Sequence, residues 1–232
     1  MAAELKDRVE RLIASETVRK LVSRYSFLQA AGCYEEVLKM FALATEGVRV
    51  EVRGRGIWDG AEGIRKAVVL IPQQLDAEYD AAMRKRLPDV PLEPRSGRLL
   101  GAQLSSPVVQ VAADGMTAKG LWTILGWETG LTAAGAPESF WRGARLGVDF
   151  IQEDREWKFW HFQTYPIFYT NYYKSWLETA KEPDLLPAYY EGAFAPDRPS
   201  STAWPAREVP DGIWWDPRPP EPYSTFSETW SY

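Results

Sequence analysis

Residues that can transfer protons occur on two consecutive strand-like segments, WRGARLGVDFI at 141–151 and WKFWHFQTY at 157–165. Two-residue alternation places Arg145 and Asp149 on one face of the first segment together with Gly143 and Gly147, two glycines that leave room for a ligand. His161, the single histidine of the chain, lies among rings on the second segment. An imidazole ionises near neutral pH, and a neighbouring carboxylate would fix its tautomer and raise its proton affinity. We therefore expect Asp149 and His161 to exchange protons with a substrate, and Arg145 to hold an oxyanion.

Tyr25 adds a hydroxyl to this candidate catalytic set, because it lies on the apolar stripe of an N-terminal helical segment. Each of the four residues also has a purely structural interpretation. Arg145 and Asp149 could pair across strands at a subunit interface, and His161 could be a core histidine bonded to a backbone carbonyl. Tyr25 could be a core tyrosine. A lysine, Lys119 or Lys158, could act as an amine nucleophile if desolvated, although lysines in alternating segments usually lie on solvated faces.

Aromatic side chains are abundant, with 11 Trp, 11 Tyr and 9 Phe among 232 residues. Such rings suit a pocket for flat apolar substrates, although a tryptophan can also simply fill a core. The residues that we expect to contact the substrate are Trp58, Trp122, Trp127, Trp141, Phe27, Gln103 and Tyr165.

Composition argues against several classes of function. The net charge of −5 and the absence of basic clusters disfavour nucleic acid as a partner. One Cys and one His leave no zinc-ligand spacing, and we expect neither a metal nor a cofactor. The N-terminus is charged, and no apolar run reaches the roughly 20 residues that cross a bilayer, which predicts a cytoplasmic protein without membrane association.

Periodicity predicts helices first and strands afterwards. Two helices broken near Ser15 and a short helix in YEEVLKMF precede a strand in VRVEVRG, a turn in GIWDG and a helix in AEGIRKAVVLI. Residues 72–98 are interpreted as an insertion, and a run of strands joined by short turns follows from Leu99, in LLGAQLS, PVVQVA, TAKGLWTILGWE, SFWRGARLGVDFIQ and WKFWHFQTYPIF. This order predicts an α+β fold, a cone-like curved antiparallel sheet closed by the N-terminal helices, over residues 1–168. Residues 169–232, rich in Pro and Trp, are expected to form an extended arm over this domain or a neighbouring subunit, and no second domain.

These elements resemble the nuclear-transport-factor-2-like superfamily, in its SnoaL-like enzyme branch. The resemblance is carried by VRKLVSRYSFLQAAGCYEEVLKMFA, IWDGAEGIRKAV, SPVVQVAADGMTAKGLWTILGWETG and GVDFIQEDREWKFWHFQTY, which together span about residues 8–168. It implies the cystatin-like α+β barrel. Known dehydratases of this superfamily use a His on an early strand and an Asp near the end of the second helix. The matching stretches here, LLGAQLSSP and FLQAAGC, are neutral, so that proton transfer would depend on other groups.

The resemblance implies a cofactor-independent lyase that acts on an aromatic, phenolic, lignin-derived molecule by elimination or retro-aldol cleavage. Long aromatic-rich members with a C-terminal arm are similar to bacterial diarylpropane lyases, which release formaldehyde and leave a stilbene. The alternatives are a dehydratase, isomerase or cyclase acting on a steroid-like or polyketide-like substrate, and a non-catalytic ligand-binding or assembly subunit. Cones of this type often pair through the sheet, which predicts a homo-oligomer, a dimer or trimer.

Overall fold

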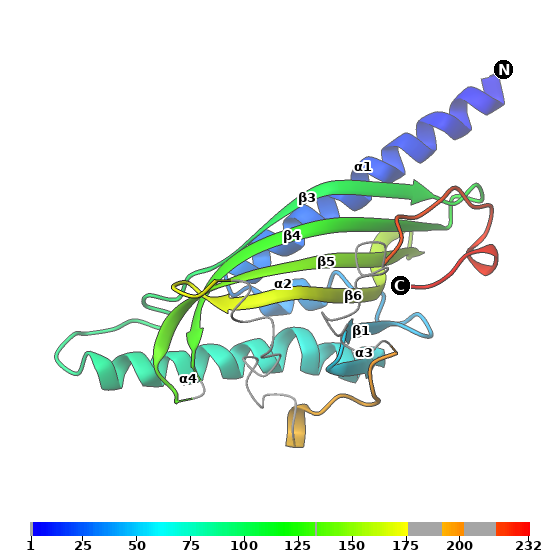
Figure 1. Cartoon of the computed structure of the whole chain (residues 1–232). Helices are drawn as coiled ribbons and strands as arrows, with labels where there is room; N and C mark the ends of the chain where they lie inside the picture. Colours follow the sequence, from blue (N-terminus) through cyan, green and yellow to red (C-terminus); the bar gives the residue numbers. More distant parts are fainter. Residues whose placement is uncertain (1, 133, 176–191, 202–216) are drawn as a thin grey trace.

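A computed structural model of the chain describes residues 2–132, 134–175, 192–201 and 217–232. It shows an α+β fold in which helices cover one face of a curved six-stranded sheet that does not close into a barrel (Figure 1). The fold class predicted from the sequence is confirmed. Among the helices of these residues, none is long and apolar enough to span a membrane.

The first helix, α1 (Ala2–Ala30), is one continuous element of 29 residues. The predicted break near Ser15 is wrong, because this region keeps its helical hydrogen bonding. Thr17 does not cap a second helix, since its hydroxyl donates to the backbone oxygen of Ile13 one turn earlier, at 2.7 Å. Only the second half of α1 packs on the sheet, through Val18 and Val22, which are both fully buried.

Shorter helices follow along the same side of the sheet. The predicted short helix is present as α2 (Tyr34–Leu38), with Val37 and Leu38 buried as expected. The next helical stretch comprises α3 (Gly60–Arg65), a π-helical turn η1 (Lys66–Leu70) and α4 (Ile71–Arg86). Pro72 lies directly after the π-helical turn, inside this continuous helical stretch, so its missing backbone N–H removes one helical hydrogen bond there. Part of the predicted insertion is therefore a continuation of the preceding helix.

The sheet has the strand order β2-β1-β6-β5-β4-β3. Its strands are β1 (Arg49–Val52), β2 (Gly56–Asp59), β3 (Leu100–Val111), β4 (Thr117–Leu131), β5 (Pro137–Glu153) and β6 (Glu156–Asn171). The pairing of β1 with β6 is parallel and the other pairings are antiparallel. The predicted turn in GIWDG is wrong, since these residues form β2, and the chain reverses at Gly54, whose φ is +73°.

The two faces of the sheet have different roles, and we call the face toward the helices the inner face. Leu146, Val148 and Phe150 of β5 lie on it and join a core cluster with Val18 and Val22 of α1. Asp149 and the other alternate residues of β5 therefore lie on the outer face.

A β-bulge on β6 changes the predicted set of residues that share a face. Asp149 is paired with His161, whereas the adjacent Phe150 is paired with Phe159, so that Trp160 is the extra residue. Uninterrupted two-residue alternation over 157–165 would place Phe159 and His161 on the same face. In the structure Phe159 is in the inner core and His161 is on the outer face.

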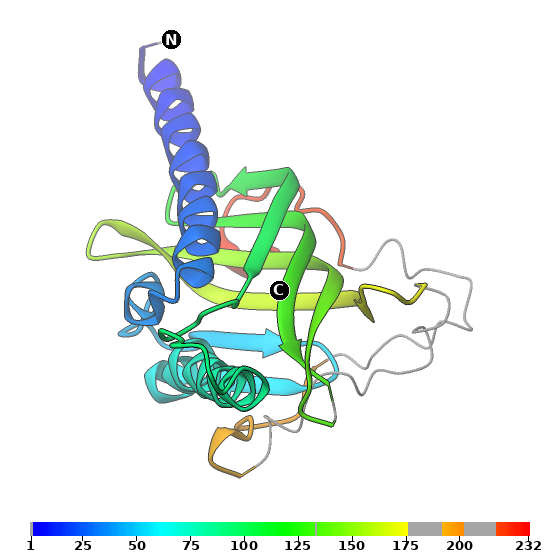
Figure 2. The same cartoon turned by 90° about the vertical axis from the view of Figure 1, so that its left-hand side faces the viewer.

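The described parts of the C-terminal region contact the outer face and the β2 edge. Arg198 forms an isolated bridge with Ile57 of β2, and Ser200 and Ser201 donate hydrogen bonds to Glu51 of β1. Residues 217–232 cross the outer side of the sheet, which Figures 1 and 2 show as the red segment opposite α1. Strand β6 extends to Asn171, three residues beyond the predicted domain boundary.

Candidate functional site

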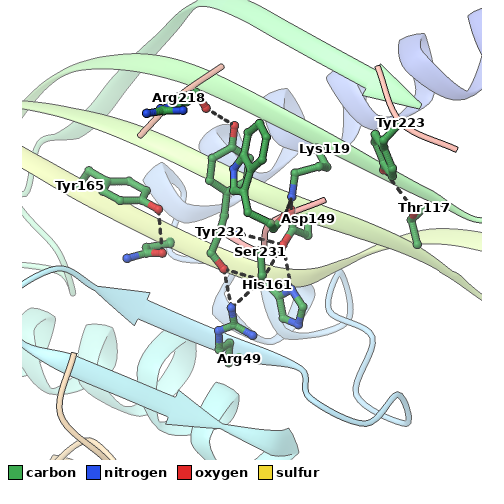
Figure 3. A network of polar contacts seen from close by, with 12 residues as sticks. Arg49, Thr117, Lys119, Asp149, His161, Tyr165, Arg218, Tyr223, Ser231 and Tyr232 are labelled. Atoms are coloured by element: carbon green, nitrogen blue, oxygen red, sulfur yellow. Dashed lines mark hydrogen bonds and ion pairs between the residues drawn. The ribbon is translucent and has the colours of Figure 1, made fainter. Parts of the chain in front are cut away.

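A buried ionic network occupies the outer face where β4, β5 and β6 run side by side (Figure 3). One oxygen of Asp149 accepts a hydrogen bond from Lys119 Nζ at 2.6 Å, and the other lies 2.8 Å from His161 Nδ1. The side chains of Lys119 and Asp149 are both 0% exposed. The expected proximity of Asp149 and His161 is confirmed, and the expectation that Lys119 lies on a solvated face is wrong.

The C-terminal segment covers this network. The Ser231 hydroxyl and the Tyr232 backbone N–H donate to the same Asp149 oxygen at 2.9 and 3.0 Å, while Lys119 also donates to the backbone oxygen of Trp230. Arg49 donates to the backbone oxygen of Tyr232 at 2.6 Å. Protein atoms thus occupy the space over Asp149 that a substrate would need.

Burial determines the protonation of the cationic groups here. It lowers the pKa of His161, and the hydrogen bond that His161 makes to Asp149 only partly opposes this effect. The pKa of Lys119 is lowered for the same reason, against the attraction of Asp149. The predicted rise in the proton affinity of His161 is therefore not observed, because desolvation outweighs the carboxylate.

Ser231, His161 and Asp149 are close together without forming a nucleophilic triad. Ser231 Oγ lies 2.8 Å from His161 Nδ1, which is the ring nitrogen that also contacts Asp149. A working triad uses one imidazole nitrogen for the nucleophile and the other for the carboxylate. The geometry is that of an anchor for the C-terminal segment.

A second polar group lies on the inner face, between β4, β5 and β6. Arg142 of β5 pairs in register with Tyr169 on one side and Gly126 on the other. Tyr169 donates its hydroxyl to Glu128 at 2.7 Å, and Glu128 is 3.8 Å from Arg142 Nη1. A Cβ at Gly126 would come within 2.5 Å of Arg142 Nε, so this glycine allows the arginine to lie across β4.

Helix α1 adds Tyr25 to this inner group. The Tyr25 ring packs against Phe162 and Phe159, with ring centroids 4.9 and 5.8 Å apart. Burial raises the pKa of Tyr25 to about 12, and the positive charge of Arg142 opposes this rise. Within the described residues the Tyr25 hydroxyl makes no hydrogen bond. The inner face therefore presents a protonated phenol whose donor is unused.

A cluster around Asp76 of α4 extends the inner group. The Tyr34 hydroxyl and Arg98 Nε donate to Asp76 at 2.7 and 3.0 Å, and Arg95 forms an ion pair with the same carboxylate at 2.9 Å. Asp76 and Arg98 therefore form an ion pair, and the charge of Arg98 also acts to lower the pKa of Tyr169 against the larger effect of burial. The inner polar group thus connects the helices to the sheet.

The structure separates the residues that the sequence placed in one site. Arg145, like Asp149 and His161, is on the outer face, opposite Tyr25. The expected substrate contacts are similarly divided. The strand register places four of them on the outer face: Gln103, Trp127, Trp141 and Tyr165. Trp122 is buried in the inner core, and Phe27 is 78% exposed on α1. Trp58 is buried on β2, where its indole N–H donates to the backbone oxygen of Phe194.

Sequence reasoning missed Arg142, Glu128 and Tyr169. One signal was available for Arg142, because it alternates in phase with Leu146, Val148 and Phe150, the apolar set that had to form the core side of β5. The position of Tyr169 could not be predicted in this way, since a second bulge on β6 separates the pair Ala144–Pro166 from the pair Gly143–Phe168. The bulge shifts every later residue by one position.

Comparison with protein families identifies the fold group. The model of the SnoaL-like domain matches residues 10–163. The chain belongs to the SnoaL-like domain family. Comparison with curated proteins gives no match.

Solved structures agree with this assignment at the level of the fold. A putative scytalone dehydratase from Novosphingobium aromaticivorans superposes with a TM-score of 0.52 and 12% identity, covering 71% of this chain and 91% of that one. LinA gives 0.53 and 13%, covering 73% and 96%. The hexachlorocyclohexane dehydrochlorinase LinA-type3 from Novosphingobium barchaimii gives 0.52 and 14%, covering 72% and 96%.

Metal binding has little support in the geometry. Within the described ranges no three His, Cys, Asp or Glu side chains are grouped so that they could hold a metal ion. The carboxylates of Asp149, Glu128 and Asp76 are instead engaged in hydrogen bonds and ion pairs with Lys, Tyr and Arg. The chemistry available on the inner face is proton transfer and stabilisation of negative charge.

Proposed function

We propose that this protein is a cofactor-independent lyase whose working groups are on the inner face, with Tyr25 as the acid and Arg142 as the group that stabilises negative charge. The observation that carries this proposal is the pairing of two donors that lack protein acceptors. The Tyr25 hydroxyl makes no hydrogen bond in the described part of the chain, and the buried Nε of Arg142 has no partner.

Tyr25 is suited to protonate a leaving group. A phenol with a pKa of about 12 is protonated at neutral pH, so it holds a proton to donate. Its conjugate base, formed when the leaving group departs, is strong enough to remove a proton in the next step. One residue can therefore act first as the acid and then as the base.

Arg142 replaces Arg145 in the role of the oxyanion partner. Both residues are on β5, but only Arg142 lies on the same face as Tyr25. A guanidinium in a partly desolvated site stabilises a developing oxyanion more strongly than it would in water. The pair of Tyr169 and Glu128 lies beside Arg142 and limits the positions that its guanidinium can take.

The substrate proposed is a phenolic aromatic molecule, and the specific candidate is a lignin-derived diarylpropanediol. Tyr25 would protonate the benzylic hydroxyl, which leaves as water while the ionised phenol delocalises the charge. The tyrosinate would then remove the proton of the primary alcohol, and the carbon–carbon bond would break. The products are one stilbene, one formaldehyde and one water, which balance the diol. Structural neighbours described as a dehydratase and a dehydrochlorinase support an elimination of this kind.

The test is turnover by the purified full chain. A phenolic diarylpropanediol is expected to give a rise in stilbene absorbance and an equal amount of formaldehyde, without added metal or cofactor. Tyr25→Phe should lower kcat by about a hundredfold or more, the usual effect of losing an acid. Release of water without formaldehyde would point to a dehydratase. Binding of aromatics without any turnover would contradict the proposal and favour a carrier.

A further inference from the structure

The side chain of Arg142 makes no hydrogen bond to any described residue, and its Nε is buried although the side chain as a whole is 29% exposed. Its nearest carboxylate, that of Glu128, is 3.8 Å away and already accepts the Tyr169 hydroxyl. A guanidinium carries five N–H donors, and donors withdrawn from water normally find acceptors. An acceptor is therefore missing from this part of the inner face.

Other arginines of the inner group have acceptors for part of their donors, although Arg95 Nε, like Arg142 Nε, is buried without a hydrogen-bond partner. Arg98 donates to Asp76 at 3.0 Å, and Arg95 donates to the backbone oxygen of Ala30 at 3.0 Å. Arg142 differs from both because none of its side-chain nitrogens donates to an acceptor among the described residues, and its positive charge acts on Tyr25. Arg142 and Tyr25 can both donate, and Glu128, the carboxylate nearest to Arg142, is occupied.

We propose that the substrate of the inner face carries an anionic oxygen group, a carboxylate or a phenolate, that binds to Arg142 and accepts a hydrogen bond from Tyr25. This inference rests on the proposed function and names the charge of its substrate. A guanidinium binds a carboxylate through two parallel hydrogen bonds, and a phenolate oxygen through a single charged contact. Either group provides the acceptor that the protein lacks.

The test compares ligands of one shape and different charge. Binding of trans-cinnamate and of neutral cinnamamide to the full chain would be measured by tryptophan fluorescence or calorimetry at low salt. The anion is expected to bind about tenfold to a hundredfold more tightly, which is the range for a hydrogen bond to a charged group. To distinguish a phenolate from a carboxylate as the bound group, binding of 4-nitrophenol would be measured below and above the pKa of this ligand, where it is neutral and anionic respectively.

Variants of two arginines on the same strand localise the effect. Arg142→Gln should remove the preference for the anion, and Arg142→Lys should retain part of it. The matched control is Arg145→Gln, three residues away on the outer face, which should leave the preference unchanged. Equal binding of the charged and neutral ligands, failure of both to bind, or a preference that survives Arg142→Gln would overturn the inference. If Arg142→Gln does not fold, the comparison of ligands on the unmodified chain decides.

The outcome is distinguishable from failure of the proposed function. Tight binding of the anion with no turnover of any aromatic diol would refute the lyase and leave the anion site intact. Turnover of neutral and anionic substrates with equal kcat/KM would refute the anion site and leave the lyase intact.

A separate observation concerns the first half of α1, which extends beyond the sheet in Figures 1 and 2. Four apolar residues at helical spacing are exposed there: Leu5 by 62%, Val9 by 44%, Leu12 by 70% and Ile13 by 61%. Helical geometry places them on the side opposite Val18 and Val22, which face the core. This apolar stripe has no partner among the described residues.

We infer that the stripe binds the same stripe of a second copy, with the two helices antiparallel. Acidic and basic residues alternate beside it, which is typical of helices that pair with helices. With a two-fold axis near residue 11, Lys6 of one copy would lie opposite Glu16 of the other, and Glu4 would lie within one residue of the position opposite Arg19. Each end of the pair would then join opposite charges.

Sedimentation equilibrium of the full chain tests this inference. A dimer is expected, and Leu12→Glu should shift it to monomer because it introduces a charge into the apolar stripe. Phe27→Glu is the control. Phe27 is at least as exposed as Leu12, but it lies in the second half of α1, outside the apolar stripe. A monomeric parent protein, or an assembly that Leu12→Glu leaves intact, would refute the inference.

Discussion

The carboxylate of Asp149 is the acceptor on which the outer network depends, and Asp149→Asn is the perturbation that tests this. Asp149 accepts from Lys119, from the Ser231 hydroxyl and from the Tyr232 backbone, and it contacts His161. An amide is nearly isosteric, so the substitution removes charge without removing volume. It leaves Lys119, whose side chain is 0% exposed, as a buried cation without a counter-ion.

The expected cost follows from that burial. Removing one partner of a buried ion pair costs about 3–5 kcal/mol, which is far more than the roughly 0–1 kcal/mol of an exposed pair. For a chain of this length such a loss corresponds to a decrease in Tm of roughly 6–20 °C. The second variant, Lys119→Met with Asp149→Asn, should recover part of this loss because the unpaired cation is gone.

The assay is urea unfolding followed by tryptophan fluorescence, together with limited proteolysis of the C-terminal segment. Asp149→Asn is expected to unfold at lower urea and to release residues 217–232 to protease. Asp154→Asn is a suitable control, since Asp154 is an exposed turn residue with a φ of +53°, a conformation that Asn tolerates. A loss below about 1 kcal/mol for Asp149→Asn, or no rescue by Lys119→Met, would refute the account of the outer network.

Two further predictions concern the same face. Because burial lowers the pKa of His161, the unfolded chain binds the imidazole proton more readily than the folded chain. The contribution of His161 to stability is therefore lost as pH falls from about 6.5 toward the lower pKa of the folded state. Urea unfolding at several pH values should show this decrease, and His161→Gln should remove it. Gly147→Ala places a methyl group 2.6 Å from the Tyr232 ring and should expose the C-terminal segment to hydrogen exchange, whereas Gly130→Ala on β4, with nothing closer than 3.5 Å, should not.

The fold was largely predictable because its long elements have strong periodicity. Four strands of 12–17 residues separated by turn residues leave little choice of topology, and the apolar side of α1 that carries Val18 and Val22 identifies the helix that covers them. Two local features were harder to predict from the sequence. The strand β2 is only four residues long. Ser15 and Thr17 are residue types that often begin a helix, but here the Thr17 hydroxyl bonds back to Ile13 within one continuous helix.

The candidate site was less predictable, since it depends on which face of each strand is covered. Alternation correctly grouped Arg145 with Asp149, but the choice between that face and the face of Arg142 required knowledge of where the helices pack. The bulge at Trp160 was a further obstacle, because one inserted residue moves His161 away from Phe159. The contact between Ser231 and His161 joins residues 70 positions apart, and local pattern carries no information about such a contact.

The central claim is that chemistry occurs on the inner face, and two arginines three residues apart test it most directly. The measurement is kcat/KM for stilbene release from a phenolic diarylpropanediol by Arg142→Gln and by Arg145→Gln. The account predicts a loss of about a hundredfold or more for Arg142→Gln and a change within about twofold for Arg145→Gln. The reverse pattern, with Arg145→Gln inactive and Arg142→Gln active, would place the reaction on the outer face and contradict the account.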